Sequence, residues 1–544
     1  MNEINPLDIS DLPEEAGETQ NNAGDKPDGS PYKPIPIPTR DIMYQHVRNF
    51  SVSQRIVFDM VITYCKSIIT AERNGDASSI VDPPLLIVHG GGGVGKSYLI
   101  HGIAQWAEKI LREGNGRNNQ DMPMVLLLAY TGVAANNIGG TTFHSGLGFK
   151  FGSDMLDLAP QKLDMAQKYL ENVEVVIVDE MSLVSSDNLY NLNKRLQEIF
   201  ASEDIFGGKC VLLIGDILQL PPIRAPAIFL PPRNFDSLVL FESPELNLWE
   251  NCQSVLLTEN FRQGQGPWLK MLNRFRIGEA TEEDIKVLQS RQSSLLSEAE
   301  YNDASHLCYT NRETNNHNNN MLNKALQDEI LEQIGANLKT PKSYNPKINE
   351  FGLIDNSQFA MNLRLKRGAR VMIISNIDIK DSLVNGSLGM VLEIVKEEDQ
   401  VISVIIRFDD DKAGLDQMER HRGKYWQHIK DKGVPIFRSI QKYQIPHKKN
   451  FKTHGAMCEI KQFPLKLAWA LTGHKVQGIT IKRPTKVVVH GHPRIPPSMY
   501  YLMFSRAQDL EQVYVENFTN VIKANEKSLI ENDNLIQRSI VQSF

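Results

Sequence analysis

Short apolar runs alternate with amphipathic stretches along the first half of this chain. The apolar runs are rich in leucine and β-branched residues, as buried parallel strands are, and they cover residues 85–88, 125–129, 173–178 and 210–214. Apolar residues recur at helical spacing around residues 97–112 and 187–202. The same spacing follows Ser51 and predicts a first helix, which Ser51 or Ser53 would cap. This alternation predicts a doubly wound α/β domain.

A second αβ pattern begins near residue 254. It predicts strands at residues 254–257, 306–309, 465–470, 486–489 and 512–515, with helices at 268–277 and 312–324. Residues 355–460 read differently, because they hold short strands separated by turn residues, at 370–375, 389–394 and 401–408. We expect this stretch to form a small β-barrel inserted into the second α/β domain.

These patterns predict a division of the chain. Residues 1–45 are polar, acidic and proline-rich, and are expected to be a disordered tail. The first domain is expected over residues 46–250, with a short wedge-like insert at 146–172. The second domain is expected over 251–354 and 461–525, the β-barrel insert over 355–460, and a C-terminal tail over 526–544.

Composition changes this picture little. The net charge of −6 among 544 residues gives no global signal of nucleic-acid binding, so any such surface must be local. The five cysteines are far apart in sequence, which predicts neither a disulfide framework nor structural zinc. No apolar run is long enough to cross a membrane, and no signal peptide or mitochondrial presequence is recognisable. An intracellular, soluble protein without a membrane partner is expected.

A glycine-rich loop follows the first predicted strand and opens a helix. It has the Gly-x4-Gly-Lys-Ser spacing of a phosphate-binding loop, with Gly90, Gly91, Gly92, Gly93, Val94, Gly95, Lys96 and Ser97 in order. Glycines let the backbone wrap a phosphate closely, and the helix N-terminus attracts anions. Lys96 is expected to reach the β- and γ-phosphates of ATP, and the Ser97 hydroxyl to hold Mg²⁺.

Polar residues also follow two later strands. Asp179 and Glu180 end the strand at 173–178, where Asp179 would hold Mg²⁺ and Glu180 would orient and deprotonate the attacking water. Gln219 follows the strand at 210–214 and, near Asp216, could sense a γ-phosphate. The spacing therefore predicts an ATP-hydrolysing site.

With these motifs, the chain resembles the PIF (petite integration frequency)-like and RecD-like branch of helicase superfamily one. Further stretches are similar to that family's motifs in the same order: residues 129–135, 140–145, 257–263, 383–389, 467–478 and 501–507. The resemblance covers about residues 50–520. It implies two RecA-like P-loop NTPase domains in tandem, an α/β fold, with the β-barrel insert in the second.

The resemblance also implies roles for single residues. Gln54 is similar to the family's adenine-reading glutamine, and Gln477 and Gly478 belong to the motif that links DNA to ATP. Arg262 and Arg506 resemble the two arginine fingers, which would approach ATP from the second domain and stabilise charge on the transferring phosphoryl group. The nucleic-acid contacts that it implies are Thr131, Phe143, His144, His474 and Lys475.

Two other stretches could contact DNA. A basic, aromatic stretch within residues 424–449 predicts either a wall of a strand channel or a solvated part of the insert, and the solvated reading is slightly favoured. The tip of the short insert, residues 149–151, could separate a duplex.

Two residues depart from the family pattern. Gly473 and Val476 stand where the family usually has Ile and Ser. Gly473 would add flexibility beside His474, and Val476 lacks a hydroxyl that could bond a phosphate. Either the coupling of ATP hydrolysis to strand movement is altered, or Val476 is a packing change without consequence.

The resulting expectation is an ATP-dependent DNA helicase that moves 5′ to 3′ on single-stranded DNA and unwinds forked duplex DNA. A monomer and a nuclear location are expected from the resemblance, whose members act in DNA replication, repair, recombination and telomere maintenance. Three alternatives stay open: a translocase without strong unwinding, a non-catalytic single-strand-binding module, and an RNA helicase.

Overall fold

The computed structural model describes residues 34–540, except 115, 118, 120–121, 150–156, 245, 265, 325, 341–347, 349–351, 355–358, 379–380 and 445–456. The chain divides into two compact units. Unit 1 comprises residues up to Ala280 together with Ile522 onward, and unit 2 comprises Thr281–Val521. Within the described residues, no helix is both long and apolar enough to cross a bilayer.

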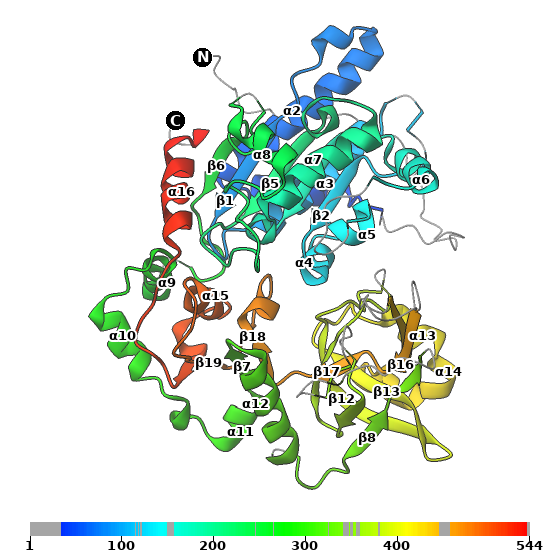
Figure 1. Cartoon of the computed structure of the whole chain (residues 1–544), viewed down its shortest axis with the longest axis vertical. Coiled ribbons are helices and arrows are strands. Elements are labelled where there is room, and N and C mark those ends of the chain that lie inside the picture. The colour runs from blue at the N-terminus through cyan, green and yellow to red at the C-terminus, as the bar shows by residue number, and fades with distance from the viewer. Residues whose placement is uncertain are drawn as a thin grey trace. The chain divides into compact units, whose positions relative to one another are not determined.

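Unit 1 is built on a six-stranded parallel sheet in the order β3-β2-β4-β5-β1-β6 (Figure 1). Its strands are β1 (Leu85–Gly90), β2 (Val125–Ala129), β3 (Thr141–Thr142), β4 (Val175–Asp179), β5 (Cys210–Gly215) and β6 (Gln253–Leu257). All residues of β2, β4 and β5 are buried, because both faces of the sheet are covered. The four strands predicted from apolar runs in this half are confirmed.

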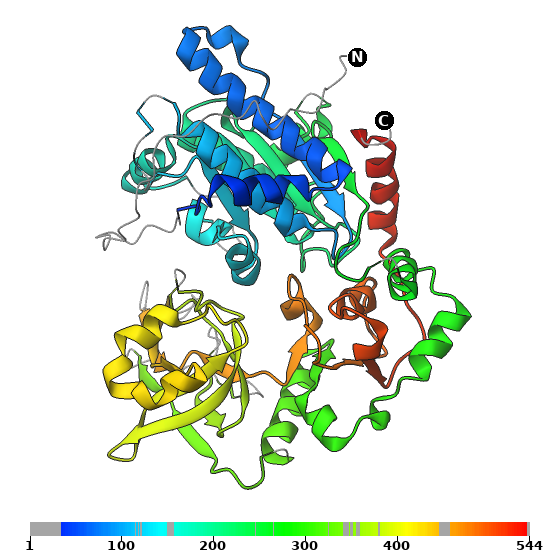
Figure 2. The ribbon, with the colours of Figure 1, turned by 180° about the vertical axis from the view of Figure 1, so that it is seen from behind.

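Helices cover both faces of this sheet. One face packs against α1 (Arg40–Arg48), α2 (Val52–Asn74) and α3 (Lys96–Leu111), which stand in front in Figure 2. The other packs against α7 (Ser186–Phe200). The remaining helices of unit 1 are α4 (Gly132–Asn137), α5 (Phe143–Leu147), α6 (Pro160–Leu170), α8 (Phe235–Glu242), α9 (Pro267–Ile277) and α16 (Glu526–Gln537).

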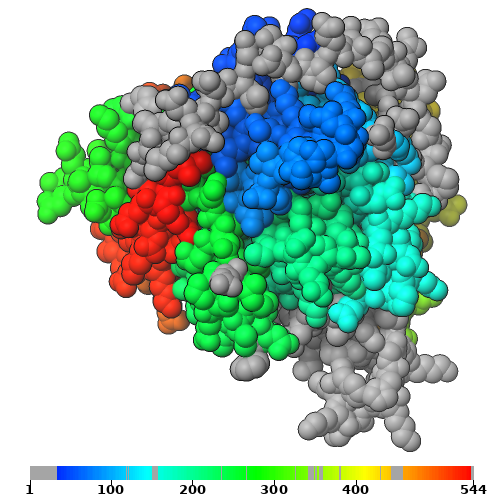
Figure 3. Space-filling view, turned by 90° about the horizontal axis from the view of Figure 1, so that it is seen from above, coloured from blue at the N-terminus to red at the C-terminus, as the bar shows by residue number. Residues whose placement is uncertain are grey.

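Three parts of unit 1 differ from the sequence prediction. Residues 40–45 begin α1 rather than extending the tail, since Met43 and Val47 bury apolar side chains; residues 1–33 lie outside the described residues. Strand β6, predicted to open the second domain, pairs in parallel with β1, so the boundary near residue 250 is misplaced. The predicted C-terminal tail contains α16, which contacts β6; Figure 3 shows this red helix against unit 1.

Unit 2 contains its own parallel sheet, in the order β18-β7-β19-β20. The strands are β7 (Ser305–Cys308), β18 (Ala470–Thr472), β19 (Val487–His490) and β20 (Val513–Glu516). Its helices are α10 (Glu282–Gln289), α11 (Glu298–Asp303), α12 (Asn311–Lys324) and α15 (Met499–Phe504). Two parallel α/β sheets in one chain confirm the predicted fold class.

Between β7 and β18, where the sequence predicts a small β-barrel insert, the chain forms antiparallel sheets. One has the order β14-β13-β12-β11-β17, another β15-β16-β9, and a third β10-β8. Their bounds are β8 (Glu332–Gly335), β9 (Asn337–Lys339), β10 (Asn362–Leu365), β11 (Arg370–Ile373), β12 (Leu388–Glu397), β13 (Gln400–Phe408), β14 (Val434–Ile436), β15 (Ser439–Gln444), β16 (Met457–Gln462) and β17 (Leu465–Leu467), with short helices α13 (Leu415–Arg420) and α14 (Arg422–Tyr425).

The insert is wider in sequence than predicted. Strands β8 and β9 precede residue 355, yet they pair with β10 and β16. The single strand predicted at 465–470 is two strands: β17 pairs with β11 in the insert, and β18 pairs with β7 in the parallel sheet. The sequence could not predict this division, because a run of consecutive apolar residues does not show which sheet each residue will join.

Candidate active site

The loop after β1 needs glycine for two physical reasons. Gly93 and Gly95 have left-handed backbones, with φ of 88° and 77°. A Cβ on Gly93 would lie 2.7 Å from Cβ of Arg262, and one on Gly95 would lie 2.7 Å from Nε2 of Gln54. Side chains at either position would therefore open the loop that leads into α3.

Lys96 is the first residue of α3 and its side chain folds back over the loop. Its ammonium donates to the carbonyl oxygens of Gly90 and Gly91, both at 2.9 Å. Burial lowers the Lys96 pKa, while the nearby carboxylates of Asp216, Glu180 and Asp179 oppose that change. A cation therefore stands inside a loop whose glycine backbone and helix N-terminus suit a phosphate.

The two predicted carboxylates lie at the carboxyl end of β4. Asp179 is the last residue of the strand, and Glu180 has a left-handed backbone with φ of 53°. The Glu180 N–H donates to Oδ1 of Asp179 at 2.9 Å. Burial, and then the charge of Glu180, raise the pKa of Asp179 to about 7. A bound divalent cation would lower this pKa, because its charge favours the ionised form of the carboxyl group.

Asp216 lies beyond the end of β5 and is fully buried. The Arg276 guanidinium of α9 holds it, with Nη2 donating to Oδ1 at 2.8 Å and Nε at 3.2 Å. Burial alone would raise the Asp216 pKa, but Arg276 and His89 hold it well below its usual range. Sequence reasoning singled out Asp216 but missed Arg276, whose distance along the chain gave no signal.

Gln219 is positioned by that same carboxylate. Its Nε2 donates to Oδ2 of Asp216 at 3.3 Å, which leaves Oε1 buried with no hydrogen-bond partner among the residues that the structure describes. A buried acceptor without a donor is costly unless a ligand or water supplies one. This amide oxygen could accept a hydrogen bond from a water molecule bound beside a phosphate.

Gln54 bonds the loop itself. Its Nε2 donates to the Val94 carbonyl at 3.1 Å and to that of Gly95 at 3.4 Å. Its Oε1 accepts from the Ser51 N–H in a capping box at the start of α2. The side chain therefore fixes α2 against the phosphate loop, and its predicted reading of adenine stays a prediction.

The 257–263 motif packs on the loop within unit 1. Asn260 Nδ2 donates to the Gly92 carbonyl at 2.6 Å, and the Phe261 N–H donates to that of Gly93 at 2.8 Å. Arg262, whose charge acts on Lys96, belongs to the same unit as the loop. The expectation that Arg262 comes from the second domain is therefore wrong, since β6 carries this motif into the first sheet. Asn260 was not predicted.

Arg506 lies in unit 2 and is 2 % exposed. Its guanidinium donates to the carbonyls of Leu502 at 3.0 Å and Ile479 at 3.2 Å, and to the Ser505 hydroxyl at 2.7 Å. These bonds join α15 to the stretch that holds Gln477 and Gly478. In this arrangement Arg506 braces that stretch, and its role as an arginine finger stays a prediction.

The two departures from the family pattern are packed positions. Val476 is fully buried, and its carbonyl accepts from Arg506 Nη1 at 3.4 Å. A Cβ on Gly473 would lie 2.2 Å from Sδ of Met499, so glycine here permits a close approach of α15. The packing favours the interpretation of Val476 as a core substitution.

The side chains predicted to contact DNA differ in their exposure to solvent. Phe143 is 1 % exposed, within the core and beside Phe149, which argues against its predicted contact with nucleic acid. His144 is partly exposed near Tyr130, and burial lowers its pKa. The Thr131 hydroxyl accepts from the Ala134 N–H and caps α4. Of the insert tip at 149–151, residues 150 and 151 lie outside the described residues.

Two lysines, Lys466 beside the 467–478 motif and Lys475 within it, are largely buried. Burial lowers the pKa of Lys475, and burial together with the Lys475 charge lowers that of Lys466 to about 8. Burial also lowers the pKa of His474. Two close ammonium groups with lowered pKa values favour an anionic ligand such as a phosphate. Lys466 was not predicted, because it lies in a strand pattern.

The basic stretch of the insert is largely neutralised where it is described. Lys424 pairs with Glu397 at 2.7 Å, Lys432 with Asp411 at 2.6 Å and Lys442 with Glu459 at 3.7 Å. Tyr425 is buried, whereas Trp426 is exposed. These pairs favour the solvated-surface interpretation over a strand channel.

Two segments of the chain match known family models. Residues 65–277 match the family model described as PIF1-like helicase, and residues 354–394 match that of the DNA helicase Pif1 2B domain. The chain is 27% identical over 492 residues to the ATP-dependent DNA helicase RRM3 of Saccharomyces cerevisiae, covering 80% of this chain and 63% of that protein. It is 26% identical over 527 residues to PIF1 of Candida albicans, covering 85% and 56%.

Solved structures agree in fold. The crystal structure of Pif1 helicase from Candida albicans superposes with a TM-score of 0.62 at 24% identity, covering 89% of this chain and 99% of that one. That of Bacteroides Pif1 with ADP-AlF3 and single-stranded DNA gives 0.60 at 24%, covering 84% and 94%. The chain spans less than two thirds of the length of the curated relatives described above.

Proposed function

Because residues 65–277 and 354–394 match its models, this chain belongs to the PIF1-like helicase family, and we propose that it is an ATP-dependent DNA helicase. One observation carries the proposal. Lys96, Asp179, Glu180, Asp216 and Gln219 come from separate motifs, yet all lie at the carboxyl ends of β1, β4 and β5 in one parallel sheet. Ligands of open α/β sheets bind at that edge.

The donor set fits Mg-ATP. Lys96 and the loop N–H groups would bind the β- and γ-phosphates, and the Ser97 hydroxyl with Asp179 would hold Mg²⁺. Bound Mg²⁺ would neutralise charge on the phosphate oxygens. Glu180 would accept a proton from the attacking water, and the orphan Oε1 of Gln219 would orient it.

Arg262 would stabilise the charge that develops on the transferring phosphoryl group, since it lies beside the loop in unit 1. The resemblance assigns the same task to Arg506. We keep that as a proposal, together with roles for Gln477 and Gly478 in the nucleotide site. An arginine finger contributes on the order of 10³-fold in rate.

For the nucleic acid, we propose single-stranded DNA, moved in the 5′-to-3′ direction, with forked duplex DNA as the substrate that is unwound. Relatives named as DNA helicases support DNA over RNA. Lys466 and Lys475 provide cationic groups for phosphates, with Thr131, His144 and His474 as further candidate contacts. Action as a monomer, a nuclear location and a role in genome maintenance rest on the resemblance alone.

The second candidate function is a DNA-stimulated translocase with little unwinding. Gly473 and Val476 motivate it, because both lie in the motif that is similar to the one linking DNA to ATP. The buried packing of Val476 supports normal coupling instead. An intact set of phosphate and carboxylate residues counts against a non-catalytic binding module.

The test is ATP hydrolysis with and without single-stranded DNA or RNA, beside unwinding of duplexes that carry a 5′ or a 3′ tail. We expect hydrolysis stimulated by DNA and unwinding from the 5′ tail alone, both lost in Lys96→Ala. Stimulated hydrolysis without unwinding would favour the translocase. Stimulation by RNA alone would indicate an RNA helicase, and binding of DNA without hydrolysis would leave a binding module.

A further inference from the structure

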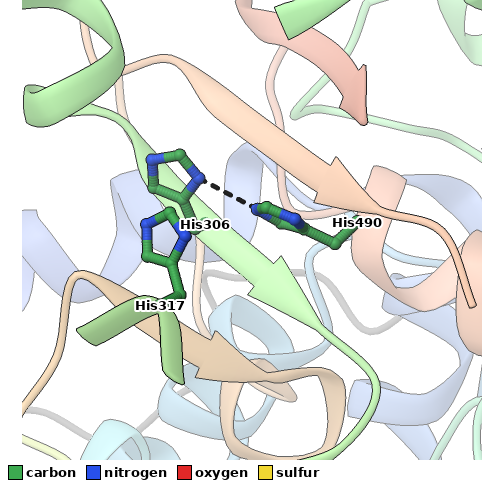
Figure 4. Close-up of side chains that lie close together, drawn as sticks. All are labelled: His306, His317 and His490. Carbon is green, nitrogen blue, oxygen red and sulfur yellow. Dashed lines mark hydrogen bonds between the residues drawn. The ribbon is translucent and has the colours of Figure 1, made fainter. Parts of the chain in front are cut away.

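Three histidines meet in unit 2, outside the phosphate-loop and carboxylate motifs of unit 1. His306 comes from β7, His317 from α12 and His490 from the end of β19 (Figure 4). One ligand nitrogen from each lies within 4.8 Å of the others. Neutral imidazole nitrogens are common ligands of divalent transition metals.

The hydrogen bonds of His306 and His490 direct their remaining nitrogens toward each other. His306 Nε2 lies 2.9 Å from the Tyr301 carbonyl, which only accepts, so Nε2 carries the proton and Nδ1 is bare in the neutral ring. Nδ1 faces His490 Nε2 at 3.0 Å. At this distance, either His490 Nε2 carries a proton and donates it to His306 Nδ1, or both nitrogens are bare and bind a metal ion.

The far side of His490 faces a carboxylate. Its Nδ1 lies 3.6 Å from Oε1 of Glu516, whose Oε2 accepts from the Tyr301 hydroxyl at 3.0 Å and from Ser293 at 2.9 Å. Metal-bound histidines usually donate their second N–H to a carbonyl or a carboxylate. Tyr301 and Glu516 supply one of each.

The third nitrogen is available. His317 Nε2 is buried and has no hydrogen-bond partner within the described part of the chain. Its ring lies 4.0 Å from that of His306, centroid to centroid. Burial lowers the pKa of His317 to about 4, and it also lowers those of His306 and His490. The rings are therefore neutral near pH 7, the form that binds metal.

We propose that His306, His317 and His490 bind one Zn²⁺ ion, with water as the fourth ligand. Zinc–nitrogen bonds are about 2.0–2.1 Å, so His317 would move toward the other two rings on binding. The ion would tie α12 to the adjacent strands β7 and β19. This departs from the expectation of no structural zinc, which rested on cysteine spacing.

The experiment uses the tag-free full chain, treated with chelator, dialysed and titrated with ZnCl₂ by calorimetry, with bound metal counted by mass spectrometry. We expect one Zn²⁺ per chain and a rise in melting temperature. Co²⁺ as a probe should give the visible absorption of a tetrahedral site. Each readout is independent of ATP hydrolysis, so failure of the helicase proposal would leave this test intact.

Two variants locate the site. His317→Gln should weaken Zn²⁺ binding at least tenfold while the protein stays folded, because its Nε2 makes no bond that the substitution would break. His492→Gln is the control, since His492 lies near Glu313 outside the cluster. It should bind Zn²⁺ as the parent does. Absence of Zn²⁺ binding, or equal binding by His317→Gln and the parent, would overturn the proposal and leave a hydrogen-bonded histidine pair.

Discussion

At Asp179, burial and the neighbouring charge of Glu180 act in the same direction, and both raise the carboxyl pKa, to about 7. The backbone N–H of Glu180 and the Lys96 ammonium oppose that rise without cancelling it. Asp216 shows the reverse balance, because Arg276, His89 and Lys96 together outweigh the effect of burial on its pKa. The pKa values of these two buried carboxyl groups on neighbouring strands are thus shifted in opposite directions, because Asp179 has an acidic neighbour and Asp216 has basic ones.

The raised pKa of Asp179 predicts a pH effect on metal binding. Between about pH 4 and 7 the native protein holds a proton that the unfolded chain has lost, so this group lowers stability as the pH rises through that window. Mg²⁺ must displace the proton. We expect the Mg²⁺ affinity of the ADP-bound protein to fall roughly tenfold per pH unit below 7.

Calorimetry in two buffers of different ionisation enthalpy measures this proton release. At pH 6 the wild type should release close to one proton when Mg²⁺ binds. Asp179→Asn, which has no carboxyl group to titrate, should bind Mg²⁺ weakly and release none. An affinity that stays constant from pH 6 to 8 would contradict the prediction.

Arg276→Gln should destabilise unit 1 by about 3 kcal/mol, because it leaves the Asp216 carboxylate buried without its charged partner. Urea unfolding of the unit 1 transition measures the loss. Arg73→Gln is the matched control, since Arg73 forms an exposed pair with Glu113 at 2.8 Å and should cost less than about 1 kcal/mol. Equal effects of the two substitutions would argue against a special role for Arg276.

Among the elements, α16 shows how sequence-distant segments complete the first sheet. Glu531 accepts from Trp249 Nε1 at 2.7 Å, and Asn532 Oδ1 lies 2.8 Å from Nε2 of His89, the residue before the phosphate loop. The Ser539 hydroxyl accepts from the Leu256 N–H of β6 at 3.2 Å. The helix therefore supports the edge of the sheet from which the loop emerges.

Leu535 and Ile530 test this packing within the same helix. Leu535 is 1 % exposed, and Leu535→Ala should cost about 3 kcal/mol through lost burial and a residual cavity. Ile530 is 65 % exposed, and Ile530→Ala should change stability by less than about 0.5 kcal/mol. Chemical denaturation compares them. Similar values would indicate that α16 does not pack on unit 1 in solution.

On the scale of the whole molecule, each unit has its own parallel sheet and its own candidate ligand. Unit 1 carries the phosphate loop and the carboxylates, whereas unit 2 carries Arg506 and the three histidines. A ligand stabilises the part of the protein to which it binds. The two units are therefore expected to respond separately to nucleotide and to zinc.

Differential scanning calorimetry should resolve two unfolding transitions. Mg-ADP is expected to raise mainly the melting temperature of the unit 1 transition, because the phosphate loop and the carboxylates lie in that unit, and Zn²⁺ that of the unit 2 transition. Lys96→Ala should abolish the first shift only, and His317→Gln the second only. One transition that moves as a whole with either ligand would refute independent units.

The sequence alone determined the phosphate loop and the strands on either side of it. Fully buried parallel strands need unbroken apolar runs, and a phosphate loop needs glycines at set positions. Both can therefore be recognised from short stretches of sequence. Asp179, Glu180 and Gln219 could be found because each lies at the carboxyl end of such a strand or a few residues beyond it. The alternation of strands and helices likewise predicted the α/β fold class.

The tertiary structure decided which segments pair. Nothing local shows that β6 joins β1, that α16 returns to unit 1, or that residues 465–472 divide between two sheets. The same holds for Arg276 against Asp216, for the burial of Phe143, and for the meeting of His306, His317 and His490. These contacts depend on sheet order and helix docking, which are set by the packing of the whole core rather than by any short stretch of residues.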